Sequence, residues 1–240
     1  MMKLIDKIKA KQENPAGAEP ITLAFIGDSV TQGCYELYKT GERSFMAEFR
    51  VEQTYHNKLR HILELCYPRV PFNMIYAGIN GNSTGSGLAR LDRDVIAFNP
   101  DLTVVCFGLN DCVSGMDNLE NYKNNLRQIF QKLKEAGGEV IFMTPNLMAN
   151  AVSPEITDEY TKEVYTNSIG HFPDFMAYMD GAREVAKEMD VALCDCAHKW
   201  ETMMNNGVDY IRLLSNRINH PTEEMHWLFA VSLFELIQGM

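Results

Sequence analysis

Short apolar segments alternate with helical segments along this chain, and this alternation restricts the possible folds more than any other feature. The apolar segments are rich in β-branched and aromatic residues and end at glycine, proline or polar residues, as strands buried on both faces do. Strands are expected at residues 21–27, 72–76, 102–107, 140–143 and 191–194, and helices at 47–65, 88–98, 119–136, 175–189 and 221–237. This order predicts an α/β fold, namely a three-layer α/β/α sandwich around a five-stranded parallel sheet.

The other segments fit a single domain that spans residues 1–240, because the chain has no internal repeat and no second core pattern. Residues 1–19 are expected to form a short amphipathic helix and a linker into the first strand. Residues 34–44 are expected to be a loop. The long connection 146–173 has weak periodicity, which is typical of a rim or lid over a functional site.

The charge pattern excludes some classes of partner. The formal net charge is −10 and no basic cluster occurs, which argues against a nucleic acid or an anionic membrane as partner. The six cysteines include no C-x-x-C pair, and Cys194-Asp195-Cys196 lacks a second pair of ligands, so we expect no metal site and no cofactor. Reduced cysteines, with neither a signal peptide nor a membrane-spanning segment visible, predict a cytoplasmic protein.

Polar and glycine residues follow several of the predicted strands. Ser29 comes directly after the first strand, in Gly27-Asp28-Ser29. Gly81 lies in the turn after the second strand, and Asn110 follows the third. Because the carboxyl ends of parallel strands share one edge of the sheet, these three residues are expected to meet there. A serine in such a place can act as a nucleophile if a base and an anion-stabilising pocket lie nearby.

Four sequence blocks in this order resemble the SGNH hydrolases, the GDSL-like esterases and lipases. The blocks are GDSVTQG, GINGNSTGSGLARL, GLND and NHPTEEMHWLFA, and together they span most of the chain. The resemblance implies a flavodoxin-like SGNH hydrolase fold and a serine esterase that needs neither metal nor cofactor. It points to Ser29 as the nucleophile and to His220 as the base.

The chemistry of these residues agrees with the resemblance. An imidazole titrates near neutrality, so His220 can take the Ser29 proton. Pro221 suits the first position of a helix, which would place His220 at the positive end of the helix dipole and disfavour its charged form. The backbone N–H groups of Ser29 and Gly81 and the side-chain amide of Asn110 are expected to form the oxyanion hole. Asp28 and Asp111 are interpreted as structural hydrogen-bond acceptors.

One position departs from the family pattern. The last block normally has Asp three residues before the histidine, and this chain has Arg217 there. An acidic partner orients the imidazole and stabilises its charged form. Three substitutes are open: the backbone carbonyl of Arg217, which we favour because it needs no rearrangement, the carboxylate of Asp209, or a weakened or altered role for the protein.

The sequence therefore predicts a carboxylic ester hydrolase that removes a small acyl group from a small-molecule ester through an acyl-serine intermediate. An acetyl group on a carbohydrate is the expected substrate. Two alternatives stay open, namely a lysophospholipase or thioesterase that acts on longer acyl chains, and a non-catalytic binding module on the same fold. Arg217 is the feature that favours the latter.

Overall fold

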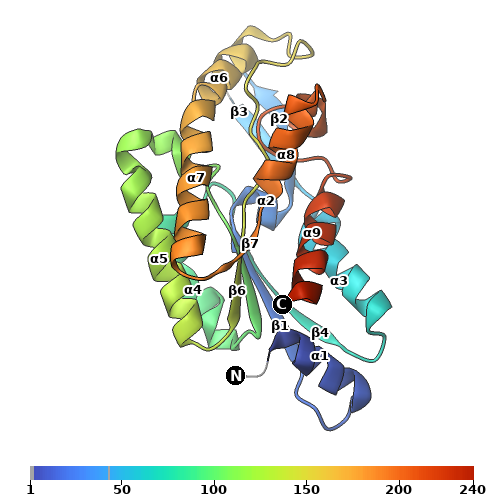
Figure 1. The fold of residues 1–240 in the computed structure, drawn as a ribbon. Helices are drawn as coiled ribbons and strands as arrows, with labels where there is room; N and C mark the ends of the chain where they lie inside the picture. The colour runs from blue at the N-terminus through green and yellow to red at the C-terminus, as the bar shows by residue number, and fades with distance from the viewer. Residues whose placement is uncertain (1–2, 43) are drawn as a thin grey trace.

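The computed structural model describes residues 3–42 and 44–240, and its centre is a five-stranded parallel sheet (Figure 1). The strands are β1 (Ile21–Gly27), β4 (Phe72–Gly78), β5 (Leu102–Cys106), β6 (Glu139–Met143) and β7 (Ala192–Cys194). Their order across the sheet is β4-β1-β5-β6-β7, and every neighbouring pair is parallel. This is the predicted flavodoxin-like order, and it reverses beside β1, where such sheets bind their ligands.

The central strands are buried because their side chains face helices on both sides. All five residues of β5 are buried, and so are all residues of β1 except Thr22. A strand of this kind has no polar face, which explains the continuous apolar run seen in the sequence. The carboxyl end of β1 is therefore held rigidly, and Ser29 begins the next element.

Helices cover both faces of the sheet (Figure 1). One face carries α4 (Thr84–Asp94), α5 (Leu119–Glu135) and α7 (Phe172–Glu188), and the other carries α1 (Leu4–Glu13), α3 (Tyr55–Cys66) and α9 (His226–Gly239). The short α2 (Ser29–Gln32) follows β1 directly, and α8 (Cys196–Asn205) follows β7. The three-layer α/β/α arrangement expected from the alternating pattern is confirmed.

The segment between β1 and α3 differs from the expectation of a loop over 34–44 and a helix from residue 47. It forms an antiparallel hairpin of β2 (Cys34–Gly41) and β3 (Ser44–Phe49), and the helix begins only at Tyr55. The spacing of apolar residues after residue 44 fits a strand as well as a helix over so short a stretch, and the strand pairing decides between them.

The hairpin contacts α6 (Glu159–Ile169), which lies in the long connection after β6. Lys39 forms an ion pair with Asp158 at 2.7 Å, and the rings of Phe45 and Tyr160 stack with centroids 6.0 Å apart. Figure 1 shows both elements at the end of the molecule beyond the carboxyl ends of the strands. The predicted rim is thus formed by two segments far apart in sequence.

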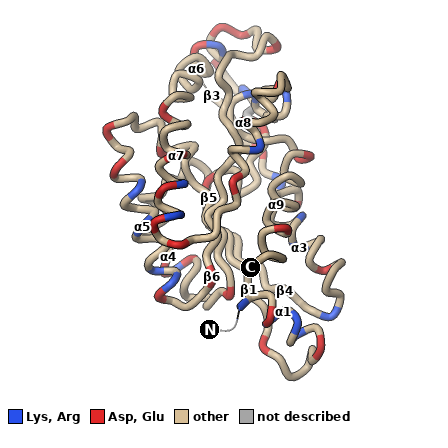
Figure 2. Tube along the Cα trace, in the orientation of Figure 1, with Lys and Arg blue, Asp and Glu red and all other residues tan. Residues whose placement is uncertain are grey.

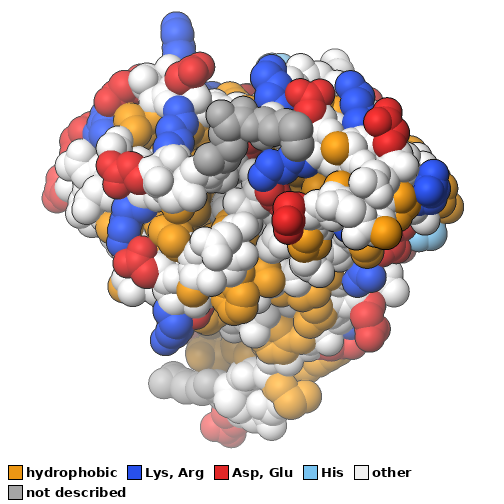
Figure 3. Space-filling model, turned by 90° about the horizontal axis from the view of Figure 1, so that it is seen from below, with side chains coloured by type: hydrophobic (Ala, Val, Ile, Leu, Met, Phe, Trp, Pro, Cys, Tyr) orange, Lys and Arg blue, Asp and Glu red, His pale blue; other side chains and the backbone are white. Residues whose placement is uncertain are grey.

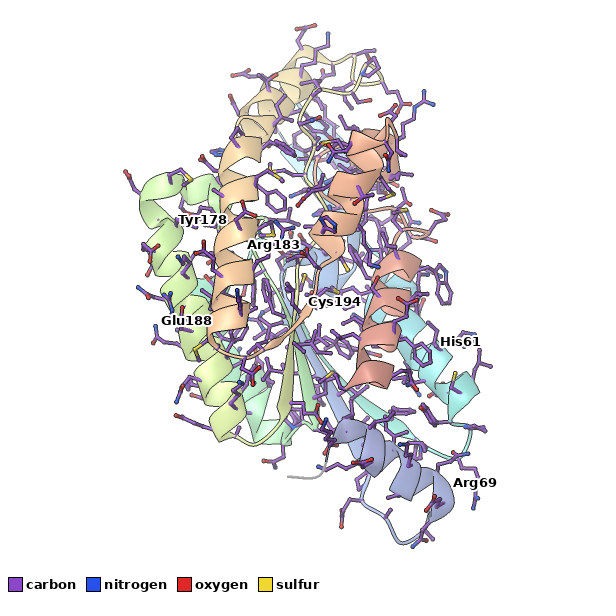
Figure 4. The ribbon with its side chains drawn as sticks, viewed as in Figure 1. His61, Arg69, Tyr178, Arg183, Glu188 and Cys194 are labelled. Carbon is purple, nitrogen blue, oxygen red and sulfur yellow. The ribbon has the colours of Figure 1, made fainter. Side chains whose placement is uncertain are left out.

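Ion pairs connect the helices at the far edge of the sheet. Arg183 on α7 donates to Asp195 and Glu201, and Figure 4 shows it near Cys194 at the end of β7. Asp195 also accepts from the Thr144 hydroxyl at 2.9 Å. These contacts fix the ends of β6 and β7 relative to each other.

Charged side chains are mixed over the surface. Lys and Arg alternate with Asp and Glu along the chain in Figure 2, and both signs are interspersed with apolar side chains on the face shown in Figure 3. Within residues 3–42 and 44–240, the helices are all too short or too polar to cross a membrane.

Replacing Gly78 by alanine should destabilise the protein, because β4 ends against the backbone of α2. A Cβ atom on Gly78 would lie 2.3 Å from the nitrogen of Gln32 and 2.5 Å from the carbonyl carbon of Thr31. Overpacking of this kind costs about 1–3 kcal/mol of unfolding free energy, measurable by urea denaturation. Gly85→Ala is the matched control, since its nearest neighbour is 3.6 Å away and alanine favours the helix α4. Equal stability of the two variants would contradict the prediction.

Candidate active site

Ser29 is the first residue of α2 and follows the buried strand β1 without a loop. Asp28 caps this helix, because its carboxylate accepts from the Val30 N–H at 3.0 Å. Ser29 is 3% exposed, so its hydroxyl is shielded from bulk water. The N–H groups in the first turn of a helix have no acceptor within the helix, which leaves the Ser29 N–H available to a ligand.

His220 lies beside Ser29 although 191 residues separate them in the sequence. The Nε2 atom of His220 is 2.9 Å from the Ser29 hydroxyl oxygen. His220 belongs to a tight loop between the turn Tyr210–Leu213 and α9, and its carbonyl accepts from the Ser215 N–H at 2.7 Å. The structure thus brings together the two residues that the sequence analysis assigned as nucleophile and base.

The second ring nitrogen of His220 identifies the tautomer. Nδ1 is 3.3 Å from the backbone carbonyl oxygen of Tyr35 in β2. A carbonyl can only accept, so Nδ1 carries the ring proton and Nε2 is left to accept from the serine hydroxyl. This is the tautomer that a general base for Ser29 requires.

The group that contacts Nδ1 therefore differs from both residues that the sequence analysis considered. It is a backbone carbonyl, as favoured there, but it belongs to Tyr35 and not to Arg217. The Arg217 guanidinium donates to Glu155 at 2.9 Å, and the Asp209 carboxylate pairs with Arg212 at 3.3 Å. The hairpin that supplies Tyr35 was not predicted, so its carbonyl was not considered.

The expected helix terminus at His220 is also corrected. The last helix begins at His226, with Met225 as its N-cap, so His220 precedes it by six residues and gains nothing from its dipole. Burial instead lowers the pKa of His220 to about 4, and the hydrogen bond to the Tyr35 carbonyl opposes this shift. The imidazole is therefore neutral at pH 7, as the expectation required, but because it is desolvated.

Gly81 lies in the turn after β4, where its φ of +74° is a conformation that suits glycine. Two hydrogen bonds tie this turn to the serine region. The Ile79 N–H donates to the Gly27 carbonyl at 3.1 Å, and the Asn80 N–H donates to the Gln32 side chain in α2 at 2.6 Å. Gly81 is exposed, and an added Cβ would meet no heavy atom within 4 Å, so there is open space beside its Cα atom.

Asn110 follows β5 and contacts the same turn. Its side-chain nitrogen donates one hydrogen to the Asn82 carbonyl at 2.9 Å. A primary amide has two N–H bonds, so the second stays available for an oxyanion. The ends of β1, β4 and β5 are thus connected in one hydrogen-bonded arrangement, as the edge of a parallel sheet predicts.

Arg90 is a buried arginine that the sequence analysis did not single out. It is 7% exposed and donates to the Gly27 carbonyl at 3.1 Å and to the Asn82 side chain at 2.9 Å. It thereby joins the strand before Ser29 to the turn that carries Gly81. The arginine inside the GLARL block could have signalled this bridging role, because an arginine on a buried helix face needs several acceptors.

The two buried carboxylates have structural partners. Asp28 caps α2, and Asp111 accepts from both the N–H and the hydroxyl of Thr84. Burial, with a smaller contribution from the nearby Asp111, raises the pKa of Asp28 to about 7 against the opposing hydrogen bond from the Val30 N–H. Both residues hold turns, in agreement with their interpretation as acceptors.

The cysteine pair near the end of β7 is the place where the sequence raised the question of a metal. The part of the chain that the structure describes contains no group of three or more His, Cys, Asp or Glu disposed around an ion. Cys194 and Cys196 are buried with their sulfurs 3.7 Å apart, but no further ligand joins them.

If the expected ester hydrolysis takes place at this site, the pH dependence of kcat/KM for p-nitrophenyl acetate should report the lowered pKa of His220. Only the neutral imidazole can accept the Ser29 proton, and its fraction falls as the pH falls through the pKa. Because that pKa is about 4, activity should hold below pH 6 and decline only near pH 4. Initial rates from pH 3.5 to 8 at constant ionic strength test this, with re-assay at pH 7 to exclude acid unfolding. An inflection near 6.5 would contradict it.

Residues 25–228 match the GDSL-like lipase/acylhydrolase family. An acetylxylan esterase of Geobacillus stearothermophilus is 32% identical over 132 residues, which cover 51% of this chain and 58% of that protein. An arylesterase of Vibrio mimicus is 28% identical over 109 residues, covering 44% of this chain and 54% of that protein. The chain thus spans little more than half the length of either relative.

Solved structures resemble the fold over a longer range. The crystal structure of Axe2, an acetylxylan esterase from Geobacillus stearothermophilus, has a TM-score of 0.66 and 21% identity. The similarity covers 90% of this chain and 94% of that one. At this identity the likeness concerns the fold alone.

Proposed function

Because the chain belongs to the GDSL-like lipase/acylhydrolase family, we propose that it hydrolyses small acyl esters, in particular acetyl esters of carbohydrates, through an acyl-Ser29 intermediate. The contact of 2.9 Å between the Ser29 hydroxyl and the His220 imidazole carries the proposal. A serine and a neutral base in this geometry form an activated nucleophile.

In the first half of the reaction, the Ser29 oxygen attacks the ester carbonyl carbon while His220 Nε2 takes the hydroxyl proton. The carbonyl π electrons move onto oxygen, and the oxyanion accepts hydrogen bonds from the N–H groups of Ser29 and Gly81 and from the Asn110 amide. The tetrahedral intermediate then expels the alkoxide. The imidazolium returns its proton to that leaving oxygen, so the alcohol departs and the acyl group stays on Ser29.

In the second half, water replaces the alcohol. His220 removes a proton from water, which attacks the acyl carbon and passes through a second oxyanion in the same pocket. Collapse breaks the bond to the serine oxygen, and the imidazolium returns the proton to Ser29. The products are the free acid and the original enzyme, so the proposed cycle needs neither metal nor cofactor.

The Tyr35 carbonyl has a consequence for the imidazolium that forms in each half. A neutral carbonyl stabilises a positive ring less than a carboxylate does, because it lacks a full negative charge. His220 is therefore a weaker base here than an imidazole with an acidic partner. We expect a slower enzyme than a family member with the complete triad, not an inactive one.

The substrate class rests on the relatives. One is named an acetylxylan esterase and the other an arylesterase, and both names denote hydrolysis of carboxylic esters. The first name supports an acetylated carbohydrate as substrate, and neither name favours longer acyl chains or a non-catalytic role. The buried setting of Ser29, at 3% exposed, also suits a small acyl group.

Hydrolysis of p-nitrophenyl esters from C2 to C12, together with acetylated xylo-oligosaccharides, tests the proposal. Highest kcat/KM on the acetyl ester, release of acetate from the oligosaccharides and loss of both in Ser29→Ala are expected. Preference for C8 to C12 esters would instead support the lipase-like alternative. Failure to react with a fluorophosphonate or any ester would support the binding module.

A further inference from the structure

Asn216 lies at the centre of the loop that carries His220. Its side-chain oxygen accepts three backbone N–H groups, from Ile218, Asn219 and His220, each at 3.0 Å. Asn216 is 3% exposed, so these three bonds form away from water. One of the three donors is the backbone of the proposed base itself.

Neighbouring segments hold Asn216 in turn. The Tyr165 hydroxyl on α6 donates to the Asn216 carbonyl at 2.7 Å, and Tyr165 is 4% exposed. The Asn146 side chain, after β6, donates to the Asn219 carbonyl at 2.8 Å. The loop is therefore attached both to the sheet edge and to the rim helix, with Asn216 between them.

Because position 217 holds no acid, the orientation of the His220 ring depends more on the hydrogen bonds of its backbone. Where an acid is present, its bond to the imidazole both orients the ring and supplies charge. Here Nδ1–H donates to the Tyr35 carbonyl at 3.3 Å, which is a long hydrogen bond. The direction of the ring must then depend more strongly on where the backbone of His220 is placed.

We propose that Asn216 is a positioning residue that places His220 for proton transfer, compensating in geometry for the missing triad acid. The proposal rests on the proposed function of Ser29 and His220. Asn216 touches no reacting atom. It acts by holding the backbone N–H groups of Ile218, Asn219 and His220 in place. Arg217 contributes from the other side of the loop, where its guanidinium pairs with Glu155.

Asn216→Ala removes the acceptor of all three N–H groups. We expect kcat to fall about 10- to 100-fold with KM little changed, as for a catalytic group displaced by about 1 Å. Asn216→Asp keeps an acceptor of similar shape, and a carboxylate binds N–H groups more strongly. Its second oxygen faces the Asn219 side chain, whose amide can turn to donate an N–H there, so kcat should return to within about threefold of wild type. A smaller folded fraction would also lower the apparent kcat without changing KM, so kcat is expressed per folded protein, and rescue by Asp separates the two causes.

Asn219→Ala is the matched control in the same loop. Its side-chain oxygen accepts only from the Asn216 amide among the contacts seen, at 3.0 Å, and its removal leaves the three N–H bonds intact. The substitution takes one acceptor from the buried Asn216 amide nitrogen, which lowers stability, but the three N–H bonds to the Asn216 oxygen persist, so kcat should stay within about twofold of wild type. Thermal unfolding of each variant confirms that folded proteins are compared.

Amide hydrogen exchange in residues 214–221 supplies a readout that needs no turnover. Exchange at residues 218–220 should accelerate about tenfold or more in Asn216→Ala and stay unchanged in Asn219→Ala, because only the first variant frees these donors. Wild-type protein without esterase activity would refute the proposed function, and exchange would still test the loop. Unchanged exchange or unchanged kcat in folded Asn216→Ala overturns the proposal, and so does an inactive Asn216→Asp variant.

Discussion

Ser29→Ala is expected to reduce kcat on p-nitrophenyl acetate by about 10⁴-fold or more, since the acyl-enzyme cannot form without the hydroxyl. His220→Ala should have a similar effect, because the serine proton then has no acceptor at 2.9 Å. KM should change little in either variant. Ser86→Ala, at an exposed position on α4, is the matched control and should keep wild-type activity.

The double variant gives a sharper result than either single one. If Ser29 and His220 act as a unit, removing both should cost no more than removing one, because each loss already abolishes the covalent route. Losses that multiply would show that the two residues act independently and would contradict the mechanism. Initial rates, corrected for spontaneous hydrolysis, decide this, and fluorophosphonate labelling should disappear in Ser29→Ala.

The sheet could be predicted because its strands are buried on both faces. A run such as Leu102–Cys106 has no polar position, so only a strand between two helix layers accommodates it. The hairpin of β2 and β3 could not be predicted in the same way, because it lies outside the sheet and its described apolar residues after Tyr35 are exposed or partly exposed. Met46, for example, is 58% exposed. The contacts of the hairpin with Asp158 and Tyr160 join segments far apart in sequence, which a local pattern does not reveal.

The candidate site also has parts that the sequence predicts and parts that it does not. Ser29, Gly81 and Asn110 each follow a strand of the sheet, so topology alone brings them to one edge. The placement of His220 depends on an irregular loop, and its partner at Nδ1 is a backbone carbonyl, which carries no residue-type signal. Side-chain roles at strand ends can thus be predicted from sequence, whereas backbone acceptors depend on the three-dimensional path of the chain.

Asn110→Ala should reduce kcat about 10²- to 10³-fold, the usual cost of losing one oxyanion donor. The negative charge exists only in the transition state and the intermediates, so KM should be nearly unchanged. Asn110 also donates to the Asn82 carbonyl, so a structural effect on the turn has to be separated from the loss of the donor. The Arg90 contact to the Asn82 side chain persists in the variant and should keep that turn in place.

Asn110→Asp tests whether the amide acts as a donor, because Asp has nearly the same shape but offers no N–H, and stability measurements then separate the loss of the bond to Asn82 from the loss of the oxyanion donor. If the amide acts as a donor, Asp is at least as inactive as Ala, since a carboxylate would repel the developing oxyanion. If Asn110 only fills space, Asp should retain most of the activity. Urea denaturation of both variants shows whether folding is affected, and an active, stable Asn110→Asp protein would remove Asn110 from the oxyanion hole.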